Sequence, residues 1–161
     1  MSFAFRPLTH AFAADSLAWR YDPPYDVYNT YVSAARVDEV ITAHFSGESE
    51  FRQVELDGVP IAIVSFGADG RVNGGDYHED ALDIGLGVAP HMTGRGLGTG
   101  IVREVVGYAV HAFSPPMLRV TIAAFNLRAQ RVWVKNGFQA ASRFTFTGTG
   151  MKFIVYTRSV R

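Results

Sequence analysis

Hydrophobic and polar positions along this chain follow two periods, and each period predicts one type of element. Apolar residues recur at helical spacing in four segments, at 11–19, 37–45, 98–113 and 126–138. Short β-rich runs predict strands at 3–7, 51–56, 60–67, 81–88, 118–125, 141–147 and 152–157. The predicted element order is therefore β, α, α, β, β, β, α, β, α, β, β.

Turn residues separate these elements and sharpen the prediction. Asp57–Gly58 lies between two β-rich runs and predicts a tight hairpin, because both residues tolerate positive φ. Proline pairs at 23–24 and 115–116 end the first and third helices, and Asn136–Gly137 supplies a helix C-cap. Hairpins mixed with strand–helix–strand crossovers predict an α/β protein with one mixed sheet and helices on its faces.

Composition narrows the class of protein. The 161 residues are 48% hydrophobic and 19% charged, which predicts one globular domain over residues 1–161. Acidic and basic residues number 15 each, so a nucleic-acid partner is disfavoured. The chain has no cysteine, which excludes disulfides, thiolate nucleophiles and a covalent cysteine intermediate.

The sequence also shows no stretch typical of a membrane span or of a signal peptide. No apolar run reaches the roughly 20 residues that span a bilayer. The amino end lacks a leading positive cluster followed by a long apolar stretch, which disfavours a signal peptide. We therefore expect a soluble, cytoplasmic protein without a membrane partner.

The stretch from His91 to Gly100, HMTGRGLGTG, places four glycines at alternate positions between a predicted strand and a predicted helix. Bare backbone there lets amide groups approach a phosphate, and the helix dipole adds about half a positive charge. The P-loop pattern fails because no lysine is present, and the dinucleotide pattern fails because the glycines alternate strictly. An anion-binding loop of another kind and a tight strand-to-helix turn without a ligand remain as interpretations.

Two motifs resemble those of the GNAT acetyltransferase superfamily. VAPHMTGRGLGTG, residues 88–100, is similar to motif A, in which a Val-x-Pro strand end leads through an Arg/Gln-x-x-Gly-x-Gly loop into a helix. NLRAQRVWVKNGF, residues 126–138, is similar to motif B. The resemblance covers essentially the whole chain and implies a GNAT-like fold, with a mixed, mostly antiparallel sheet of about seven strands and about four flanking helices.

The resemblance also implies acetyl-coenzyme A as the co-substrate, with no metal. The glycine-rich loop would meet the pyrophosphate, a main-chain amide near residues 86–88 would polarise the thioester carbonyl, and Asn126 would assist the pantetheine arm. Helix N-capping is the other role open to Asn126. Thr93 stands where the family has Arg or Gln, with Arg95 close by. The implied cofactor-binding residues are Leu86, Val88, Thr93, Gly94, Arg95, Gly96, Leu97, Gly98, Thr99, Asn126 and Ala129.

Acetyl transfer to an amine needs a neutral nucleophile, and an alkyl ammonium with a pKa of about 10.4 is almost fully protonated at neutral pH. The family often carries a carboxylate on the strand before the loop, and the matching residue is Asp83, which would accept the proton. A solvated strand residue without a catalytic role is the alternative interpretation of Asp83.

Trp133 departs from the family pattern, which usually places tyrosine here as the acid that protonates the leaving thiolate. An indole N–H donates hydrogen bonds but is no proton source near neutral pH. Water, another hydroxyl or the acceptor's own ammonium would then supply the proton. Packing is the other interpretation of Trp133, and it is compatible with each of these.

The resemblance also implies that the acceptor is held largely by the segment between the first two helices, which is WRYDPPYDVYNTY in this chain. Its aromatic and carboxylate side chains, with Tyr21, Tyr25, Asp26 and Tyr28 as candidate substrate-binding residues, suit a cationic amine. An irregular loop packed on the sheet is the alternative. The loop GGDYHED offers no convincing metal-ligand spacing.

Together these features predict an acetyl-coenzyme A-dependent N-acetyltransferase that acts by direct attack of a primary amine on the thioester, with a small molecule or peptide as acceptor. A non-catalytic acyl-coenzyme A-binding or sensing domain is the alternative, because Thr93 and Trp133 depart from the family motifs. An exposed final strand further suggests a homodimer.

Overall fold

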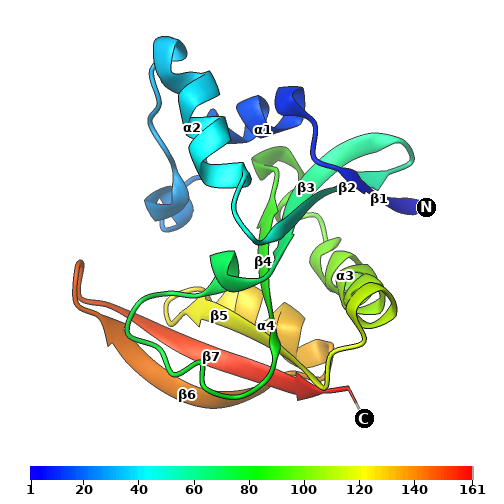
Figure 1. The fold of residues 1–161 in the computed structure, drawn as a ribbon, viewed down its shortest axis with the longest axis vertical. Coiled ribbons are helices and arrows are strands. Elements are labelled where there is room, and N and C mark those ends of the chain that lie inside the picture. Colours follow the sequence, from blue (N-terminus) through cyan, green and yellow to red (C-terminus); the bar gives the residue numbers. More distant parts are fainter. Residues whose placement is uncertain (161) are drawn as a thin grey trace. The chain divides into compact units, whose positions relative to one another are not determined.

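A computed structural model describes residues 1–160, which form seven strands, four α-helices and four short 3₁₀ turns (Figure 1). The strands are β1 (Phe3–Pro7), β2 (Glu50–Leu56), β3 (Val59–Phe66), β4 (Leu82–Val88), β5 (Met117–Ala123), β6 (Gln139–Phe146) and β7 (Met151–Ser159). The helices are α1 (His10–Leu17), α2 (Val37–Phe45), α3 (Gly98–Phe113) and α4 (Leu127–Lys135). The predicted order of strands and helices is confirmed.

One mixed sheet contains all seven strands of residues 1–160, in the order β1-β2-β3-β4-β5-β7-β6, which confirms the α/β class. β4 and β5 are parallel, while β1–β2, β5–β7 and β6–β7 are antiparallel. The last strand, β7, therefore lies between β5 and β6, and β6 forms the edge. The expectation of an exposed final strand is wrong, because the closing hairpin places its first strand outside.

The ends of the elements follow from local residue chemistry. Asp57 and Gly58 adopt φ of 51° and 83°, as a two-residue hairpin turn requires. The Thr9 hydroxyl caps α1 by accepting from Phe12 N–H at 3.1 Å. Gly137, at φ 89°, follows α4, which ends three residues earlier than the predicted segment because Asn136 already forms its C-cap.

Internal contacts divide the chain into two compact units. The first comprises Met1–Val64 and Leu86–Thr93. Within it, β1 pairs with β2, α1 packs against α2, and Ala89 N–H donates to the Ile61 carbonyl at 2.8 Å. A single domain over residues 1–161 stays a prediction.

The second unit comprises Ser65–Gly85 and the chain from Gly94 onward. The strands of this unit carry helices on one face and the long loop before β4 on the other. On one face Tyr156 of β7 donates to Gln130 of α4 at 2.9 Å, and α3 packs against α4. Thr121 of β5 points to the opposite face, because successive strand residues alternate and Tyr156 pairs with Val120. There Thr121 shares a 2.8 Å hydrogen bond with Tyr77 of the long loop before β4.

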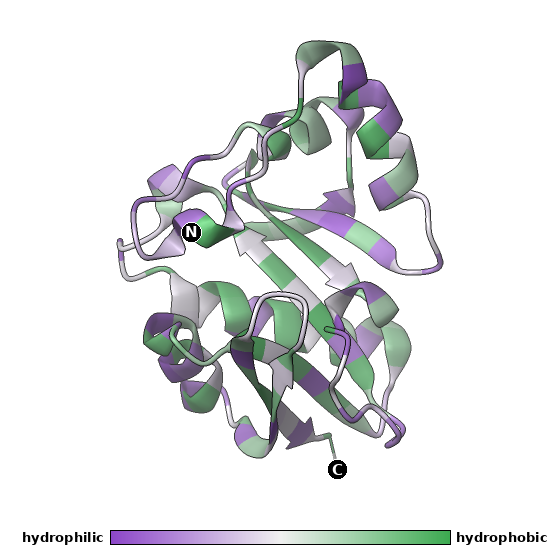
Figure 2. Ribbon diagram, turned by 90° about the vertical axis from the view of Figure 1, so that its left-hand side faces the viewer, coloured by the Kyte–Doolittle hydropathy of each residue, from purple (hydrophilic) through white to green (hydrophobic). Residues whose placement is uncertain are grey.

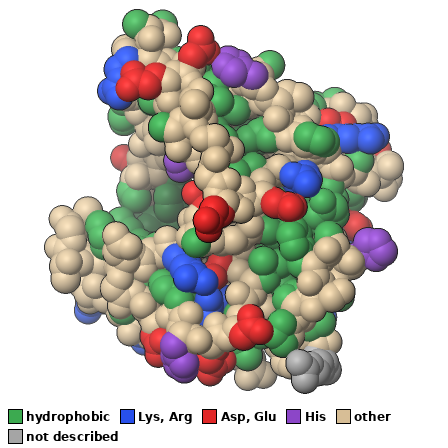
Figure 3. Space-filling view, in the orientation of Figure 1, with side chains coloured by type: hydrophobic (Ala, Val, Ile, Leu, Met, Phe, Trp, Pro, Cys, Tyr) green, Lys and Arg blue, Asp and Glu red, His purple; other side chains and the backbone are tan. Residues whose placement is uncertain are grey.

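The core follows the hydrophobic pattern. Buried aliphatic side chains line the strands and the inward side of α3, and Figure 2 shows hydrophobic residues concentrated along these elements. On the face in Figure 3, basic and acidic side chains are interspersed, in keeping with the balanced charge of the sequence. No helix within residues 1–160 has the length and apolar character needed to cross a membrane.

Candidate functional site

Two different demands select glycine in the glycine-rich loop, and neither applies to Gly100. Gly94 and Gly96 adopt φ of 70° and 75°, and a Cβ on either would meet nothing within 4 Å, so backbone conformation and not crowding selects glycine. Gly98 begins α3, where a Cβ would lie 3.1 Å from Val132 Cγ2 of α4. Gly100 has open space, with Arg103 Nη2 at 3.9 Å from its Cβ position.

The amino end of α3 offers unsatisfied donors. Leu97 occupies the N-cap position and makes no side-chain cap hydrogen bond. The amides of the first helical residues, Gly98, Thr99 and Gly100, have no partner within the helix, because intrahelical bonding begins with Ile101 N–H to the Leu97 carbonyl at 3.0 Å. A loop with two left-handed glycines that leads into an uncapped helix can hold an anion with backbone alone.

Thr93 takes a local role in the first unit. Its hydroxyl donates to the Pro90 carbonyl at 2.7 Å and closes the 3₁₀ turn Pro90–Met92. The position where the family carries Arg or Gln therefore completes a turn in this chain. Arg95 is exposed in the second unit.

Asn126 and Ala129, two of the predicted cofactor-binding residues, are bonded to each other. Asn126 Oδ1 accepts from Ala129 N–H at 3.1 Å, which makes Asn126 the N-cap of α4. The capping interpretation is confirmed, and a contact of Asn126 with the co-substrate stays a prediction.

Asp83 forms a buried ion-pair network in the second unit. Its side chain is 2% exposed, and Arg119, also 2% exposed, donates to both carboxylate oxygens, with Nε–Oδ1 at 2.7 Å and Nη2–Oδ2 at 2.8 Å. Arg71 Nε donates to Oδ2 at 2.8 Å. The interpretation of Asp83 as a solvated strand residue is wrong, because the register of β4 and β5 places Arg119 directly opposite.

This network holds the loop before β4 on the sheet. The bond to Asp83 raises the pKa of Arg119 above its usual value, so the guanidinium stays charged. Arg71 and Arg119 lie over the Tyr77 ring, at 5.4 and 4.9 Å from its centroid. Two guanidinium groups occupy both oxygens of Asp83, which favours a structural role for this carboxylate over proton transfer.

Trp133 is part of the core. Its side chain is 4% exposed and lies edge-on to Phe138, with ring centroids 5.0 Å apart and an interplanar angle of 85°. The packing interpretation is confirmed. Aromatic packing at this distance stabilises the turn between α4 and β6.

The aromatic segment after α1 packs on the end of β4 within the first unit. Tyr21 donates its phenol hydrogen to the Val88 carbonyl at 2.6 Å and its amide hydrogen to Asn29 Oδ1 at 2.7 Å. Tyr28 meets the Tyr21 ring edge-on at 6.4 Å. Tyr25 and Asp26 stand in the 3₁₀ turn Tyr25–Tyr28. The packed-loop interpretation holds for Tyr21, and acceptor binding by these four residues stays a prediction.

Ser65, which lies outside the predicted site, is a buried polar residue of the second unit. Ser65 is 3% exposed, and its Oγ has no hydrogen-bond partner among the described residues. A Cβ on Gly85 would lie 2.5 Å from this Oγ and 3.8 Å from Asp69 Oδ2. No sequence pattern predicts this arrangement, because neither Ser65 nor Asp69 belongs to a motif.

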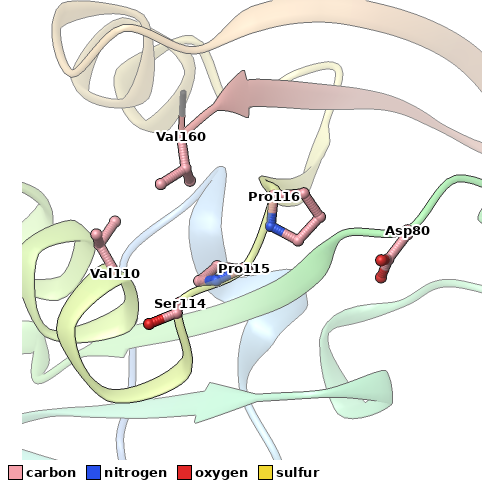
Figure 4. Close-up of a pocket in the computed structure, with 6 residues that line it drawn as sticks. All are labelled: Asp80, Val110, Ser114, Pro115, Pro116 and Val160. Atoms are coloured by element: carbon pink, nitrogen blue, oxygen red, sulfur yellow. The ribbon is translucent and has the colours of Figure 1, made fainter.

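Other polar groups lie elsewhere. Among residues 1–160 no group of three or more His, Asp or Glu side chains is arranged to hold a metal ion. A pocket of about 440 Å³ is lined by Asp80, Val110, Ser114, Pro115, Pro116 and Val160, none of which is a predicted site residue (Figure 4).

Comparison with known proteins places the chain among acetyltransferases. Residues 3–139 match the family model described as Acetyltransferase (GNAT) domain. No curated protein sequence matches the chain. The fold is similar to that of aminoglycoside acetyltransferase AAC(6')-Ib in complex with coenzyme A, with a TM-score of 0.76 and 21% identity over 99% of this chain and 95% of that chain.

A second solved structure of similar fold is a chimera of the spermidine N-acetyltransferase SpeG from Vibrio cholerae and hSSAT. It matches with a TM-score of 0.71 and 14% identity over 99% of this chain and 96% of that chain. At these identities the likeness shows the fold.

Proposed function

Because the chain belongs to the GNAT family of acetyltransferases, we propose that it transfers the acetyl group of acetyl-coenzyme A to a primary amine of a small molecule or peptide. The observation that carries the proposal is the loop in which Gly94 and Gly96 are left-handed and lead into the uncapped start of α3. Backbone amides in such a loop suit a pyrophosphate, which needs several donors and little space.

A cationic amine is the acceptor class that the chemistry of the first unit supports. The segment after α1 carries tyrosine faces beside the carboxylates of Asp22 and Asp26, both exposed. Aromatic rings and carboxylates attract an ammonium group together. Solved structures of similar fold are named for aminoglycosides and spermidine, which are amines of this kind.

Only a few groups of the chain would take part directly in the reaction. Loop amides of the second unit would bind the pyrophosphate, and a main-chain amide of Leu86–Val88 would donate to the thioester oxygen as negative charge develops there. The ammonium first loses one proton to water, and the neutral amine then attacks the thioester carbon. The C–S bond breaks, and a second proton of the nitrogen passes to the coenzyme A thiolate. Trp133 supplies no proton in this scheme, because its indole is a buried packing group.

The proposal is tested by following free coenzyme A thiol in a mixture of the protein, acetyl-coenzyme A and a panel of amines containing spermidine, kanamycin and a lysine peptide. Thiol release that depends on both protein and amine is expected, with N-acetylated product confirmed by mass. A protein that binds coenzyme A in calorimetry and acetylates no amine would support the binding-domain alternative.

In that outcome Trp133→Tyr becomes informative. A gain of turnover in this variant would show that the missing acid had silenced the site. A homodimer also stays a prediction, and the oligomeric state is measured directly by light scattering.

A further inference from the structure

The strand end Leu86–Val88 has to present a main-chain amide to the thioester carbonyl in the proposed function, and hydrogen bonds of the first unit show how it is oriented. Ala89 N–H donates to the Ile61 carbonyl of β3 at 2.8 Å. A trans peptide directs its C=O opposite to its N–H, so the Val88 carbonyl points away from β3. Both polar groups of one strand residue point to the same side, and Val88 N–H therefore also points away from β3.

The peptide between Val88 and Ala89 is held through both of its polar groups. Its N–H is bonded to Ile61, and its C=O accepts the phenol hydrogen of Tyr21 at 2.6 Å. A planar peptide held in this way cannot tilt without breaking one of the two bonds. Only the φ and ψ angles of Val88 separate this peptide from Val88 N–H. Tyr21 and β3 together therefore fix the direction of that amide.

Tyr21 is itself anchored within the first unit. Its backbone N–H donates to Asn29 Oδ1 at 2.7 Å, and its ring meets Tyr28 edge-on at 6.4 Å. Two residues earlier, Trp19 packs on the same strand end, with Cζ3 3.8 Å from the position of a Cβ on Gly87. The phenol thus reaches Val88 from a segment that is fastened by side-chain and backbone contacts.

The phenol of Tyr21 occupies the place that the N–H of a neighbouring strand would take beside the Val88 carbonyl. The place of that strand's C=O lies next to Val88 N–H, and there a thioester oxygen would accept a hydrogen bond. Tyr21 has a single phenol hydrogen and donates it to Val88, so the phenol does not itself donate to the thioester. Any effect of Tyr21 on the thioester therefore passes through the backbone of Val88.

We infer that Tyr21 is a positioning residue of the transfer reaction, which holds the Val88–Ala89 peptide so that Val88 N–H faces the thioester oxygen. This inference rests on the proposed function. As the amine attacks, the carbonyl electron pair moves onto oxygen, and Val88 N–H stabilises the negative charge until the C–S bond breaks and the carbonyl re-forms. An amide that is turned away loses more in this charged state than in the bound ground state.

The first test compares Tyr21→Phe with the matched control Ser16→Ala. Tyr21→Phe keeps the ring and removes only the hydroxyl. Ser16→Ala removes a hydroxyl in α1 that also donates to a backbone carbonyl at 2.6 Å, that of Ala13, far from β4 in sequence. The readouts are the Kd for acetyl-coenzyme A and kcat at saturating amine, for whichever of spermidine, kanamycin and the lysine peptide wild type acetylates fastest.

Tyr21→Phe should lower kcat by about tenfold, because the amide remains present and is only less well aimed. Outright removal of an oxyanion donor costs more, about 10²–10³-fold. The Kd for acetyl-coenzyme A should not change. Ser16→Ala should keep the wild-type kcat and Kd.

A spectroscopic readout measures the hydrogen bond to the thioester directly and needs no turnover. Acetyl-coenzyme A that is isotope-labelled at the thioester carbonyl is bound to each protein without amine, and its C=O stretching band is recorded by infrared difference spectroscopy. A hydrogen bond from Val88 N–H weakens the C=O bond. The band should therefore lie at lower frequency in wild type and Ser16→Ala than in Tyr21→Phe.

The outcomes separate this inference from the proposed function. A carbonyl band at the same frequency in wild type and Tyr21→Phe overturns the role of Tyr21, whatever the rates. A loss of kcat in Ser16→Ala as large as in Tyr21→Phe also overturns it, because lost stability then explains both. Absence of transfer by wild type overturns the proposed function, and the infrared comparison then decides by itself whether Tyr21 orients the amide.

Discussion

The phenol group of Tyr21 donates a 2.6 Å hydrogen bond to the backbone carbonyl of Val88. The bond fixes the segment after α1 to the end of β4, and Trp19 lies beside it, with Cζ3 3.8 Å from the Cβ position of Gly87. The segment proposed to hold the acceptor and the strand end proposed to polarise the thioester are thus packed together within one unit.

Tyr21→Phe should weaken both packing and acceptor binding. The variant removes one hydrogen bond, so the free energy of unfolding should fall by about 1 kcal/mol in a urea titration. The KM for the amine should rise, while the Kd for coenzyme A stays the same. Tyr31→Phe is the matched control, because Tyr31 is 79% exposed. An unchanged amine KM in Tyr21→Phe would argue against acceptor binding by this segment.

Gly96→Ala tests the phosphate loop. At φ 75° an alanine is strained by about 1–2 kcal/mol, and its relaxation would turn loop amides away from the anion. We expect coenzyme A affinity, measured by calorimetry, to fall at least about tenfold, or about 1.4 kcal/mol. Gly107→Ala on the exposed side of α3 should leave affinity unchanged and stabilise the helix. Equal affinities of the two variants for coenzyme A would show that the loop does not bind it.

Breaking the ion-pair network around Asp83 should lower the free energy of unfolding. Arg119→Met leaves a buried carboxylate with a single partner and should lower the free energy of unfolding by about 3–5 kcal/mol. Arg71→Met should have a smaller effect, because Arg71 is 43% exposed and its charge is solvated. Chemical denaturation of both variants measures the difference. Equal losses would contradict the assignment of Arg119 as the buried anchor.

The exposed pair His78–Asp76 gives a pH prediction with a defined sign. The hydrogen bond to Asp76 raises the pKa of His78 above 6.5, and the same bond lowers the pKa of Asp76 below 3.8. The His78 contribution to stability is complete below its unfolded pKa and disappears as pH rises through its folded pKa. The Asp76 contribution is complete above its unfolded pKa and disappears as pH falls through its folded pKa. The pair therefore stabilises the loop most between the two unfolded values.

An NMR titration of the His78 ring checks this shift. The midpoint should lie above 6.5 in wild type and return toward 6.5 in Asp76→Asn. Identical midpoints in the two proteins would show that the bond does not form in solution.

Local patterns in the sequence predicted the elements well. The helix α2 begins and ends at the predicted residues, and Asp57–Gly58 forms the expected turn, because both depend on neighbours along the chain. The left-handed glycines at 94 and 96 were likewise visible as a motif. Strand order escaped prediction, since the place of β7 inside the sheet depends on pairing between distant segments.

The sequence predicted only those parts of the candidate site that belong to recognisable motifs. Asp83 and Arg119 are the single charged residues of β4 and β5, and this pattern indicates a buried ion pair that hydrophobic periodicity alone does not predict. Asp69 and Ser65 carry no such signal. Their relation to Gly85 arises from the close approach of β3 and the turn after it to β4, and only the fold reveals it.

The measurement that tests the central claim most directly is a mass-spectrometric transfer assay. Purified protein and acetyl-coenzyme A are incubated with an extract of small metabolites and peptides, and a protein-free mixture serves as control. The proposed function predicts a new species about 42 Da heavier than a primary amine in the extract, because an acetyl group replaces one hydrogen of the amine. Confirmed coenzyme A binding without any acetylated product would contradict it.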